Sequence, residues 1–221
     1  MTKTKQNILI FSDFDGTITL QDTGSVLIDE FFSQAKRKAV DEQVFNKEIT
    51  QVEAFTAMWN AVTCDWEGCK ERLKDVALDP YFKEFYAFIQ SKDIPLTVLS
   101  SGLIQIINWY IGKHIDNFNS VVAANEGDYS KGYWDVKYYD ETPYGHDKAL
   151  TISKSKANYE NPLTLFIGDG ITDLMACSQS DVVFARRGRD LEKYCKLNSI
   201  EHIAFDDFST ILDWLKNYLN N

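Results

Sequence analysis

Two aspartates, Asp13 and Asp15, stand two residues apart where an apolar segment ends and a turn begins. The segment before them, residues 8–11, is short, aliphatic and uncharged, which is typical of a strand buried on both faces of a parallel sheet. Gly16 and Thr17 then break the strand. We therefore expect both carboxylates at the carboxyl end of a central strand, where open α/β sheets bind ligands. An isolated Asp-Phe-Asp-Gly segment is equally typical of a solvated turn, so other residues must decide.

Polar residues follow two later apolar segments in the same way. They are Ser100, Ser101 and Gly102 after residues 96–99, and Asp169 and Asp173 after residues 163–167, with Lys148 at a predicted helix start shortly before. The carboxyl ends of parallel strands lie along one edge of a sheet. These residues are therefore expected to converge on Asp13 and Asp15.

The chemistry of this set is coherent for phosphoryl transfer. A cluster of carboxylates is unfavourable without a cation, and an all-oxygen ligand set suits Mg²⁺, which also neutralises charge on a phosphate. Asp13, the first residue of the turn, is the better nucleophile for phosphorus. Asp15 is placed to protonate the leaving alkoxide and then to take a proton from water, a role that needs a raised pKa.

The remaining residues of the set are suited to hold the phosphate. We expect the Ser100 hydroxyl, the amides of Ser101 and Gly102 at a helix N-terminus, and the Lys148 ammonium to bind its oxygens. Lys148 also supplies the local positive charge that an anionic substrate requires in an acidic chain.

The composition excludes several classes of partner. The chain has 221 residues and a formal net charge of -10, which argues against nucleic acid and against an anionic membrane surface. A small phosphate ester remains the expected partner, and the oligomeric state is left open. Four cysteines and a start without the pattern of a signal peptide indicate reduced thiols and a cytoplasmic protein.

Strand and helix patterns alternate along most of the chain. Strands are predicted over residues 8–11, 96–99, 118–123, 163–167 and 182–185, a hairpin over 127–140, and a closing helix over 208–215. This alternation predicts a Rossmann-like, doubly wound parallel α/β sheet. Residues 20–90 read as several consecutive helices, which is more than one crossover needs. We therefore expect a core domain of residues 1–19 and 91–221 with a helical insertion of residues 20–90.

At this point the chain closely resembles the haloacid dehalogenase (HAD) superfamily of aspartate-nucleophile phosphatases. Residues 13–19 match the first motif of that superfamily, Leu99-Ser100 the second, Lys148 the third and residues 168–173 the fourth. The resemblance implies that Asp13 is the nucleophile and Asp15 the acid/base. It also implies that Asp13, the Asp15 carbonyl and Asp169 bind Mg²⁺ with support from Asp173, and that residues 20–90 are the small helical cap.

Within the superfamily, the chain resembles the branch of phosphoserine phosphatase and the methionine-salvage phosphatase, with residues 139–148 and 184–190 most similar to fungal polyol-phosphate phosphatases. The serine-specific pattern has a Glu after the first motif, where Asp22 stands here, and a cap arginine, whereas residues 48–69 contain neither Lys nor Arg. We therefore expect a phosphomonoester with an uncharged polar body, such as a polyol or sugar phosphate. Asp22 is interpreted either as a substrate contact or as a helix N-cap.

Several alternatives stay open. The substrate is otherwise phosphoserine or the methionine-salvage enediol phosphate, and remoter readings are a phosphotransferase or mutase, or a non-catalytic binding protein. Trp134 and Tyr138 either cover the site or form an exposed pair on the hairpin. The three arginines that follow the strand at 182–185 either add positive potential or lie in a solvated loop, the second being favoured; they are Arg186, Arg187 and Arg189.

Overall fold

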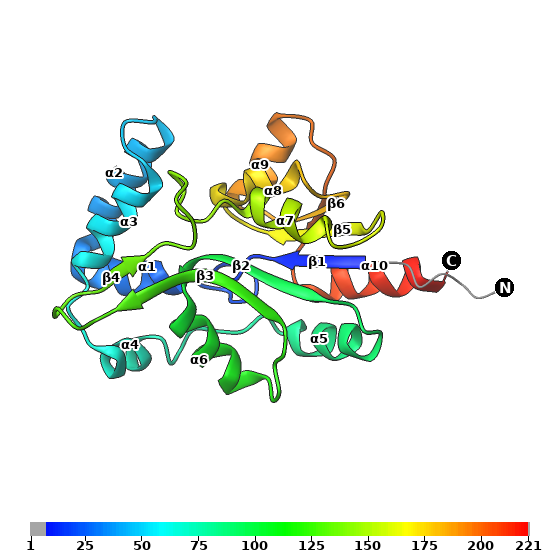
Figure 1. The fold of residues 1–221 in the computed structure, drawn as a ribbon, viewed down its shortest axis with the longest axis horizontal. Helices are drawn as coiled ribbons and strands as arrows, with labels where there is room; N and C mark the ends of the chain where they lie inside the picture. Colours follow the sequence, from blue (N-terminus) through cyan, green and yellow to red (C-terminus); the bar gives the residue numbers. More distant parts are fainter. Residues whose placement is uncertain (1–7, 221) are drawn as a thin grey trace.

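A seven-stranded sheet lies at the centre of the protein (Figure 1). The computed structural model describes residues 8–220; residues 1–7 and 221, assigned above to the core domain, lie outside the described residues. The strands are β1 (Ile8–Ser12), β2 (Leu96–Leu103), β3 (Val121–Asp128), β4 (Asp135–Lys137), β5 (Leu163–Gly168), β6 (Val182–Arg186) and β7 (Ile203–Phe205). Their order is β4-β3-β2-β1-β5-β6-β7, and neighbours run parallel except β3 and β4. The predicted parallel α/β sheet is confirmed.

Strand β1 occupies the middle of this sheet. Each of its residues is buried, and it pairs with β2 on one side and β5 on the other, with Ile10 opposite Leu96 and Leu165. A strand covered on both faces needs apolar residues at every position, which is why this segment shows no polar alternation. The residue that follows β1 therefore emerges at the centre of the carboxyl edge.

Two layers of helices cover the sheet, as Figure 1 shows. One layer is α5 (Phe82–Ser91), α6 (Ile104–His114) and α10 (Phe208–Asn220), and the other is α7 (Lys148–Lys156), α8 (Leu174–Cys177) and α9 (Asp190–Leu197). Alternate residues of β1 serve the two layers, because successive strand side chains point to opposite faces. Ile8 and Ile10 pack in the first layer's core, and Leu9 and Phe11 in the second.

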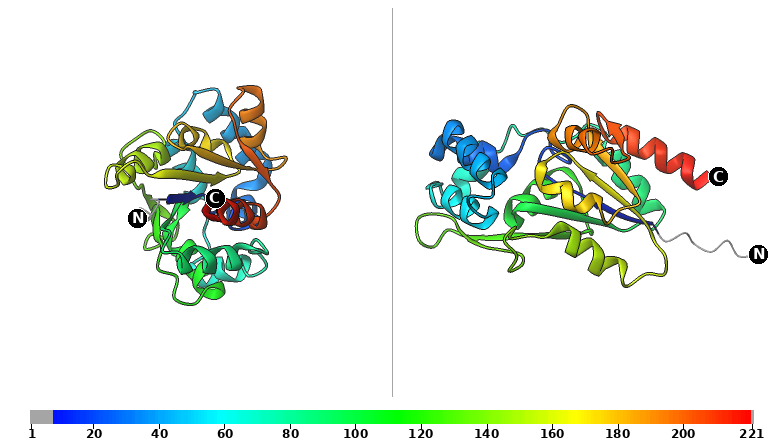
Figure 2. Two further views of the ribbon diagram at one scale, coloured as in Figure 1. Left: turned by 90° about the vertical axis from the view of Figure 1, so that its right-hand side faces the viewer. Right: turned by 90° about the horizontal axis from the view of Figure 1, so that it is seen from above.

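The remaining helices lie beyond the carboxyl ends of the strands, at the opposite end of the molecule from the end of α10 (Figure 2). They are α1 (Thr23–Ile28), a π-helical turn η1 (Asp29–Ser33), α2 (Gln34–Phe45), α3 (Gln51–Asn60) and α4 (Trp66–Arg72). We call these elements the cap helices. Side chains cap the starts of α1, α2, α3 and α4, and at α3 the cap is a reciprocal pair between Thr50 and Glu53.

The chain enters and leaves the cap helices through two antiparallel passages. Thr19 and Leu78 form an isolated bridge between them. The Leu20 amide donates to the Ala77 carbonyl at 2.8 Å, and the Asp79 amide donates to the Ile18 carbonyl at 2.9 Å. We call residues 17–20 and 77–79 the hinge.

The β3–β4 hairpin packs against the cap helices. Trp134 is buried, with its Nε1 donating to the Cys64 carbonyl at 3.0 Å, and its ring lies against Trp59 and Trp66. The Tyr138 hydroxyl donates to the Val52 carbonyl at 2.9 Å. The alternative that Trp134 and Tyr138 form an exposed pair is therefore wrong, because both side chains contact cap helices distant in sequence. That they cover the site remains a prediction.

Several predicted boundaries differ from the structure. Strand β3 begins at Val121 rather than at residue 118, and β7 and α9 were not predicted. Helix α5, which follows the hinge, packs beneath the sheet, where the Phe82 and Phe85 rings lie 5.0 and 4.9 Å from the Phe208 ring. None of the helices within residues 8–220 is both long and apolar enough to cross a membrane.

Candidate active site

Asp13 lies directly after β1 and is 6% exposed. Its amide donates to the Ile167 carbonyl of β5 at 2.9 Å, so the neighbouring strand fixes its backbone. Its Oδ1 accepts a hydrogen bond from Lys148 Nζ at 2.7 Å. Burial raises the pKa of Asp13 well above its ordinary value, and Asp173 and Asp169 add to this, whereas the Lys148 ammonium opposes it. Negative charge therefore exceeds positive charge around this buried carboxylate.

Lys148 stands at the first position of α7 and is 2% exposed. Its Nζ donates to Asp13 Oδ1 at 2.7 Å and to Asp173 Oδ1 at 2.6 Å. Burial disfavours its charge, but these two carboxylates together raise the pKa of Lys148. An ammonium group has three donors, so one remains after both ion pairs are formed. The prediction that Lys148 begins a helix beside Asp13 is confirmed.

Asp173 links Lys148 to the turn after β5. It is fully buried, and its Oδ2 accepts from the amides of Asp169 and Gly170 at 3.0 Å each. Gly168 leaves room for this carboxylate, since a Cβ at that position would lie 2.5 Å from Asp173 Oδ2. Asp173 therefore positions both the lysine and the backbone that carries Asp169.

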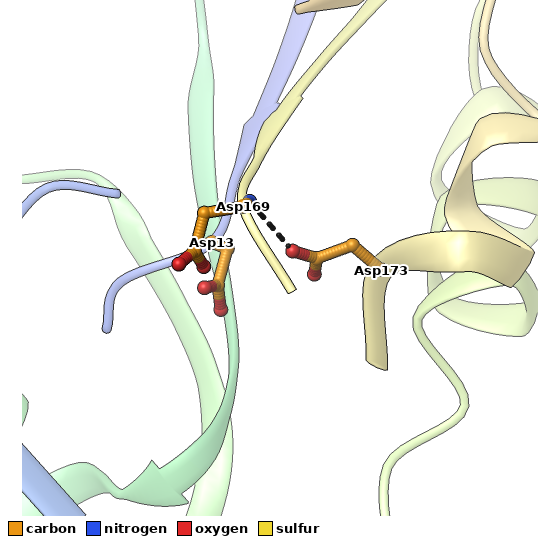
Figure 3. Close-up of side chains that lie close together, drawn as sticks. All are labelled: Asp13, Asp169 and Asp173. Atoms are coloured by element: carbon orange, nitrogen blue, oxygen red, sulfur yellow. Dashed lines mark hydrogen bonds between the residues drawn. The ribbon is translucent and has the colours of Figure 1, made fainter. Parts of the chain in front are cut away.

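Asp13, Asp169 and Asp173 form a carboxylate cluster in which ligand oxygens lie within 4.8 Å of one another. Figure 3 shows the carboxylates of Asp13 and Asp169 side by side, with Asp173 bonded to the Asp169 amide. Burial, Asp173 and Asp22 raise the pKa of Asp169 to about 7. A set of hard oxygen ligands with excess negative charge fits a divalent cation such as Mg²⁺.

Gly16 closes this cluster from the side of the first loop. Its φ is +73°, and a Cβ there would lie 2.3 Å from Asp169 Oδ2. Only glycine meets both requirements, since side chains are disfavoured at positive φ and there is no space for one. The Gly that breaks the strand pattern is thus needed for the approach of Asp169 to the loop.

Asp15 points away from the carboxylate cluster toward the cap. Its Oδ1 accepts from both the amide and the hydroxyl of Thr23, at 2.7 and 2.6 Å. Burial raises the pKa of Asp15 to about 7, as does Asp22, against the opposing Thr23 hydrogen bonds. A carboxyl with such a pKa can both hold and release a proton near neutral pH. Its role as a metal ligand through the backbone carbonyl remains a prediction.

The Ser100–Gly102 segment lies differently from the prediction. Strand β2 continues to Leu103, so these amides are not at a helix N-terminus, and α6 begins only at Ile104. Between Leu99 and Leu103, the partner on β3 advances only from Ala123 to Asn125, so the segment bulges from the sheet. The Gly102 amide donates to Ser100 Oγ at 2.9 Å. That hydroxyl keeps its own proton for another acceptor, and phosphate binding by this bulge remains a prediction.

Sequence reasoning missed the side chains that hold the bulge. His146 Nδ1 contacts the Ser100 carbonyl at 2.9 Å, and Asn125 Nδ2 donates to the Ser101 carbonyl at 2.7 Å. Burial lowers the pKa of His146 to about 4, so the ring is neutral and Nδ1 carries the proton that it donates. The neighbouring Asp147 caps the start of α7. No local pattern marks such long-range partners.

Asp22 is the N-cap of α1, with Oδ1 accepting from the Ser25 amide at 2.6 Å. The N-cap interpretation is thus confirmed, and a substrate contact remains a prediction. Its charge also reaches the site, because it contributes to the raised pKa of both Asp15 and Asp169. Among the arginines expected in a solvated loop, Arg187 and Arg189 are exposed, but Arg186 is buried, so that expectation is wrong for Arg186.

Comparison with known proteins agrees with this geometry. The sequence model of the haloacid dehalogenase-like hydrolases matches residues 10–177. The chain is 38% identical to Pdp3-interacting factor 1 of Schizosaccharomyces pombe, over 95% of this chain and 93% of that protein. It is 33% identical to the polyol phosphate phosphatase PYP1 of Saccharomyces cerevisiae, over 96% and 93%.

More distant proteins share the whole length of the fold. The chain is 29% identical to the 2-hydroxy-3-keto-5-methylthiopentenyl-1-phosphate phosphatase of Bacillus cytotoxicus, over 96% of this chain and 97% of that protein. A solved structure of a phospho-aspartyl intermediate analogue of phosphoserine phosphatase superposes with a TM-score of 0.73 at 17% identity, covering 95% of this chain and 99% of that one. The protein belongs to the haloacid dehalogenase-like hydrolase family.

Proposed function

We propose that this protein is a Mg²⁺-dependent phosphomonoesterase that hydrolyses a small phosphorylated metabolite through an aspartyl-phosphate intermediate. The proposal rests on one observation: the Lys148 ammonium bonds Asp13 at 2.7 Å and Asp173 at 2.6 Å inside the carboxylate cluster. A nucleophile held by a buried ammonium beside a cation site is suited to attack a phosphate ester.

The metal would be held by Asp13, Asp169 and the Asp15 carbonyl, and Asp173 would orient these ligands. This assignment is supported by the proximity of the three carboxylates and by the raised pKa of Asp13 and Asp169, which burial and mutual repulsion produce. Bound Mg²⁺ would neutralise charge on the phosphate and on its ligands. The protein residues around the metal would each have a separate role in the reaction.

Asp13 forms a bond from its carboxylate oxygen to phosphorus as the bond from phosphorus to the leaving oxygen breaks. Asp15 donates its proton to that oxygen, so the alcohol departs neutral. Asp15 then accepts a proton from a water molecule that attacks phosphorus, which breaks the bond to Asp13 and releases inorganic phosphate. The pKa of Asp15, raised to about 7 by burial and by Asp22, supports both proton transfers near neutral pH.

The phosphate oxygens would be held by Ser100, by the amides of Ser101 and Gly102, and by the remaining donor of Lys148. The Ser100 hydroxyl accepts from Gly102 and is free to donate to another atom. A Cβ at Gly102 would lie 3.0 Å from Asp15 Oδ2, so this bulge borders the acid/base as well. Phosphate bound there would lie next to Asp15.

A polyol or sugar phosphate is the substrate that this chain favours. Both arginines of the cap helices are already paired: Arg37 with Asp29 and Asp41, and Arg72 with Glu30. A substrate carboxylate would thus lack a free arginine on these helices to bind it with two parallel hydrogen bonds. The 33% identity to a polyol phosphate phosphatase supports an uncharged, hydroxylated leaving group, and Asp22 would accept from such hydroxyls.

The test is an assay of phosphate release with Mg²⁺ on a polyol phosphate, a sugar phosphate, phosphoserine and the methionine-salvage enediol phosphate. We expect the first two to be preferred, and preference for phosphoserine would contradict the substrate assignment. Asp13→Asn should lower kcat by about 10⁴-fold or more while the protein stays folded, because the amide is a poor nucleophile. Phosphoryl transfer to added polyol in place of phosphate release would indicate a phosphotransferase.

A further inference from the structure

Arg186 ends β6 and is only 7% exposed. Its guanidinium joins three separate segments of the chain. Nη2 donates to the Thr17 carbonyl at 2.7 Å and to Asp79 Oδ2 at 2.8 Å, and Nη1 donates to the Asp206 carbonyl at 2.7 Å. None of these partners lies on β6, so the side chain ties the edge of the sheet to segments distant in sequence.

Two of these partners belong to the hinge. Thr17 lies two residues after Asp15, where the chain leaves the core for the cap helices, and Asp79 lies where the chain returns. Between them run the Leu20 amide bond to Ala77 and the Asp79 amide bond to Ile18. Arg186 therefore contacts both passages of the hinge at the point where they meet the core.

Asp79 extends the network beneath the sheet. Its side chain is fully buried, and its Oδ1 accepts from the amides of Tyr81 and Phe208 at 3.1 Å each, at the starts of α5 and α10. A buried carboxylate needs a paired cation, and a guanidinium with several donors in one plane can serve three acceptors together. The Arg186 carbon Cζ also lies 4.8 Å from the Phe205 ring centre. The ion pair is thus enclosed and specific to arginine.

We infer that Arg186 is a positioning residue that sets the cap hinge against the loop carrying Asp13 and Asp15. This inference rests on the proposed function for its kinetic consequence. Asp15 is bonded to Thr23, the first residue of α1 beyond the hinge, so displacement of the hinge moves Thr23 relative to Asp15. Asp13 is held instead by hydrogen bonds with Lys148 and with the Ile167 carbonyl, neither of which belongs to the hinge. Arg186 thus governs the acid/base and the cap more than the nucleophile.

Two substrates separate these roles. An alkoxide leaving group needs the proton of Asp15 and contacts the cap, whereas nitrophenolate leaves without protonation. Arg186→Lys keeps the charge beside Asp79 but loses the planar fork. We expect it to lower kcat/KM for a polyol phosphate by about tenfold or more, and that for p-nitrophenyl phosphate by less than about threefold.

The matched control is Arg187→Lys, the same substitution at the adjacent exposed arginine, which pairs with Asp206. This control should leave kcat/KM for both substrates unchanged. Hydrogen exchange gives a readout independent of activity: the amides of Leu20 and Asp79 should exchange about tenfold faster or more in Arg186→Lys, and at the native rate in Arg187→Lys. Asp79→Asn, under the same measurements, replaces Arg186→Lys if that variant does not fold.

Native exchange rates at both amides in Arg186→Lys would overturn the inference. An equal fall in kcat/KM for the two substrates would also overturn it, since general destabilisation lowers both values equally. If the native protein hydrolyses neither phosphate ester, the proposed function fails, while the exchange rates still test whether Arg186 holds the hinge. A selective loss of kcat/KM for the polyol phosphate, together with faster exchange at the Leu20 and Asp79 amides, supports the inference about Arg186.

Discussion

The carboxyl edge of the sheet and the cap helices use charge in opposite ways. At the edge, buried ionised groups bond one another: Lys148, at the start of α7, pairs with Asp13 and Asp173, which follow β1 and β5. In the cap, cations lie in partly exposed pairs such as Arg72 with Glu30, and the interior facing the hairpin is aromatic. On the proposed function, the edge performs the chemistry common to all phosphate esters, and the cap selects the alcohol.

The largest expected effect comes from breaking the buried charge network. Lys148→Met leaves the carboxylates of Asp13 and Asp173 without their cation, which should destabilise the fold by about 3–5 kcal/mol. Because the same ammonium is proposed to bind phosphate, kcat/KM should also fall by about 100-fold or more. Thermal unfolding and steady-state kinetics measure both.

The control for this change is Lys137→Met, at an exposed lysine that pairs with Glu126 on the hairpin. Surface pairs contribute little, so its stability and activity should stay close to native. Equal effects of the two substitutions would remove the distinction between the sheet edge and the surface pairs.

The next effect concerns the cation site. Gly16→Ala adds a Cβ 2.3 Å from Asp169 Oδ2 and should weaken Mg²⁺ activation by about tenfold or more. Gly132→Ala is matched in backbone conformation, with φ of +79°, but has nothing within 4 Å. It should lower stability only, by about 1 kcal/mol. Mg²⁺ titrations of activity distinguish steric crowding of Asp169 from strain, and similar metal affinities in both variants would contradict the assignment.

His146 sharpens the comparison through pH. Burial lowers its pKa to about 4 from an ordinary value of about 6.5, so the unfolded chain binds the proton first as pH falls. The contribution of the neutral His146 ring to the free energy of unfolding is complete above pH about 6.5. As the pH falls toward about 4, this contribution is lost progressively, by up to about 3 kcal/mol.

Unfolding free energies of His146→Gln between pH 7 and 4 should therefore vary less than those of the native protein. His202→Gln, at a partly exposed histidine immediately before β7, serves as the control. A native-like pH dependence in His146→Gln would show that another group causes the loss of stability in acid.

The smallest effect lies in the cap, at Asp22. Asp22→Ala removes the N-cap of α1 and should cost about 1 kcal/mol, whereas Asp22→Ser keeps a capping oxygen and should cost little. If Asp22 also accepts hydroxyls of the substrate, both variants should raise KM for a polyol phosphate by a similar factor. A raised KM in the alanine variant alone would reduce Asp22 to a structural role.

The sheet edge was more predictable from sequence than the cap. Asp13, Lys148 and Asp169 could be predicted to lie together because each stands at the end of a strand or the start of a helix, and parallel strands bring such ends together. The bulge at Ser100–Gly102 could not be predicted, because an apolar strand pattern does not reveal two extra residues between Leu99 and Leu103.

Contacts between distant segments were also beyond sequence reasoning. Arg186 and Asp79 are 107 residues apart, and neither carries a local signal that the other completes. Trp134 was ambiguous for the same reason, since its burial depends on the Cys64 carbonyl and on cap rings. Periodicity identifies an element and its apolar face but not the element that packs against that face.

The central claim is that Asp13 forms a covalent bond to phosphorus. We propose to quench the protein rapidly in acid during turnover of a polyol phosphate with Mg²⁺, and to map the modified peptide by mass spectrometry. The account predicts a phosphoryl group on the peptide containing Asp13, and its absence in Asp13→Asn. Turnover without that adduct, with full activity retained in Asp13→Asn, would contradict the account.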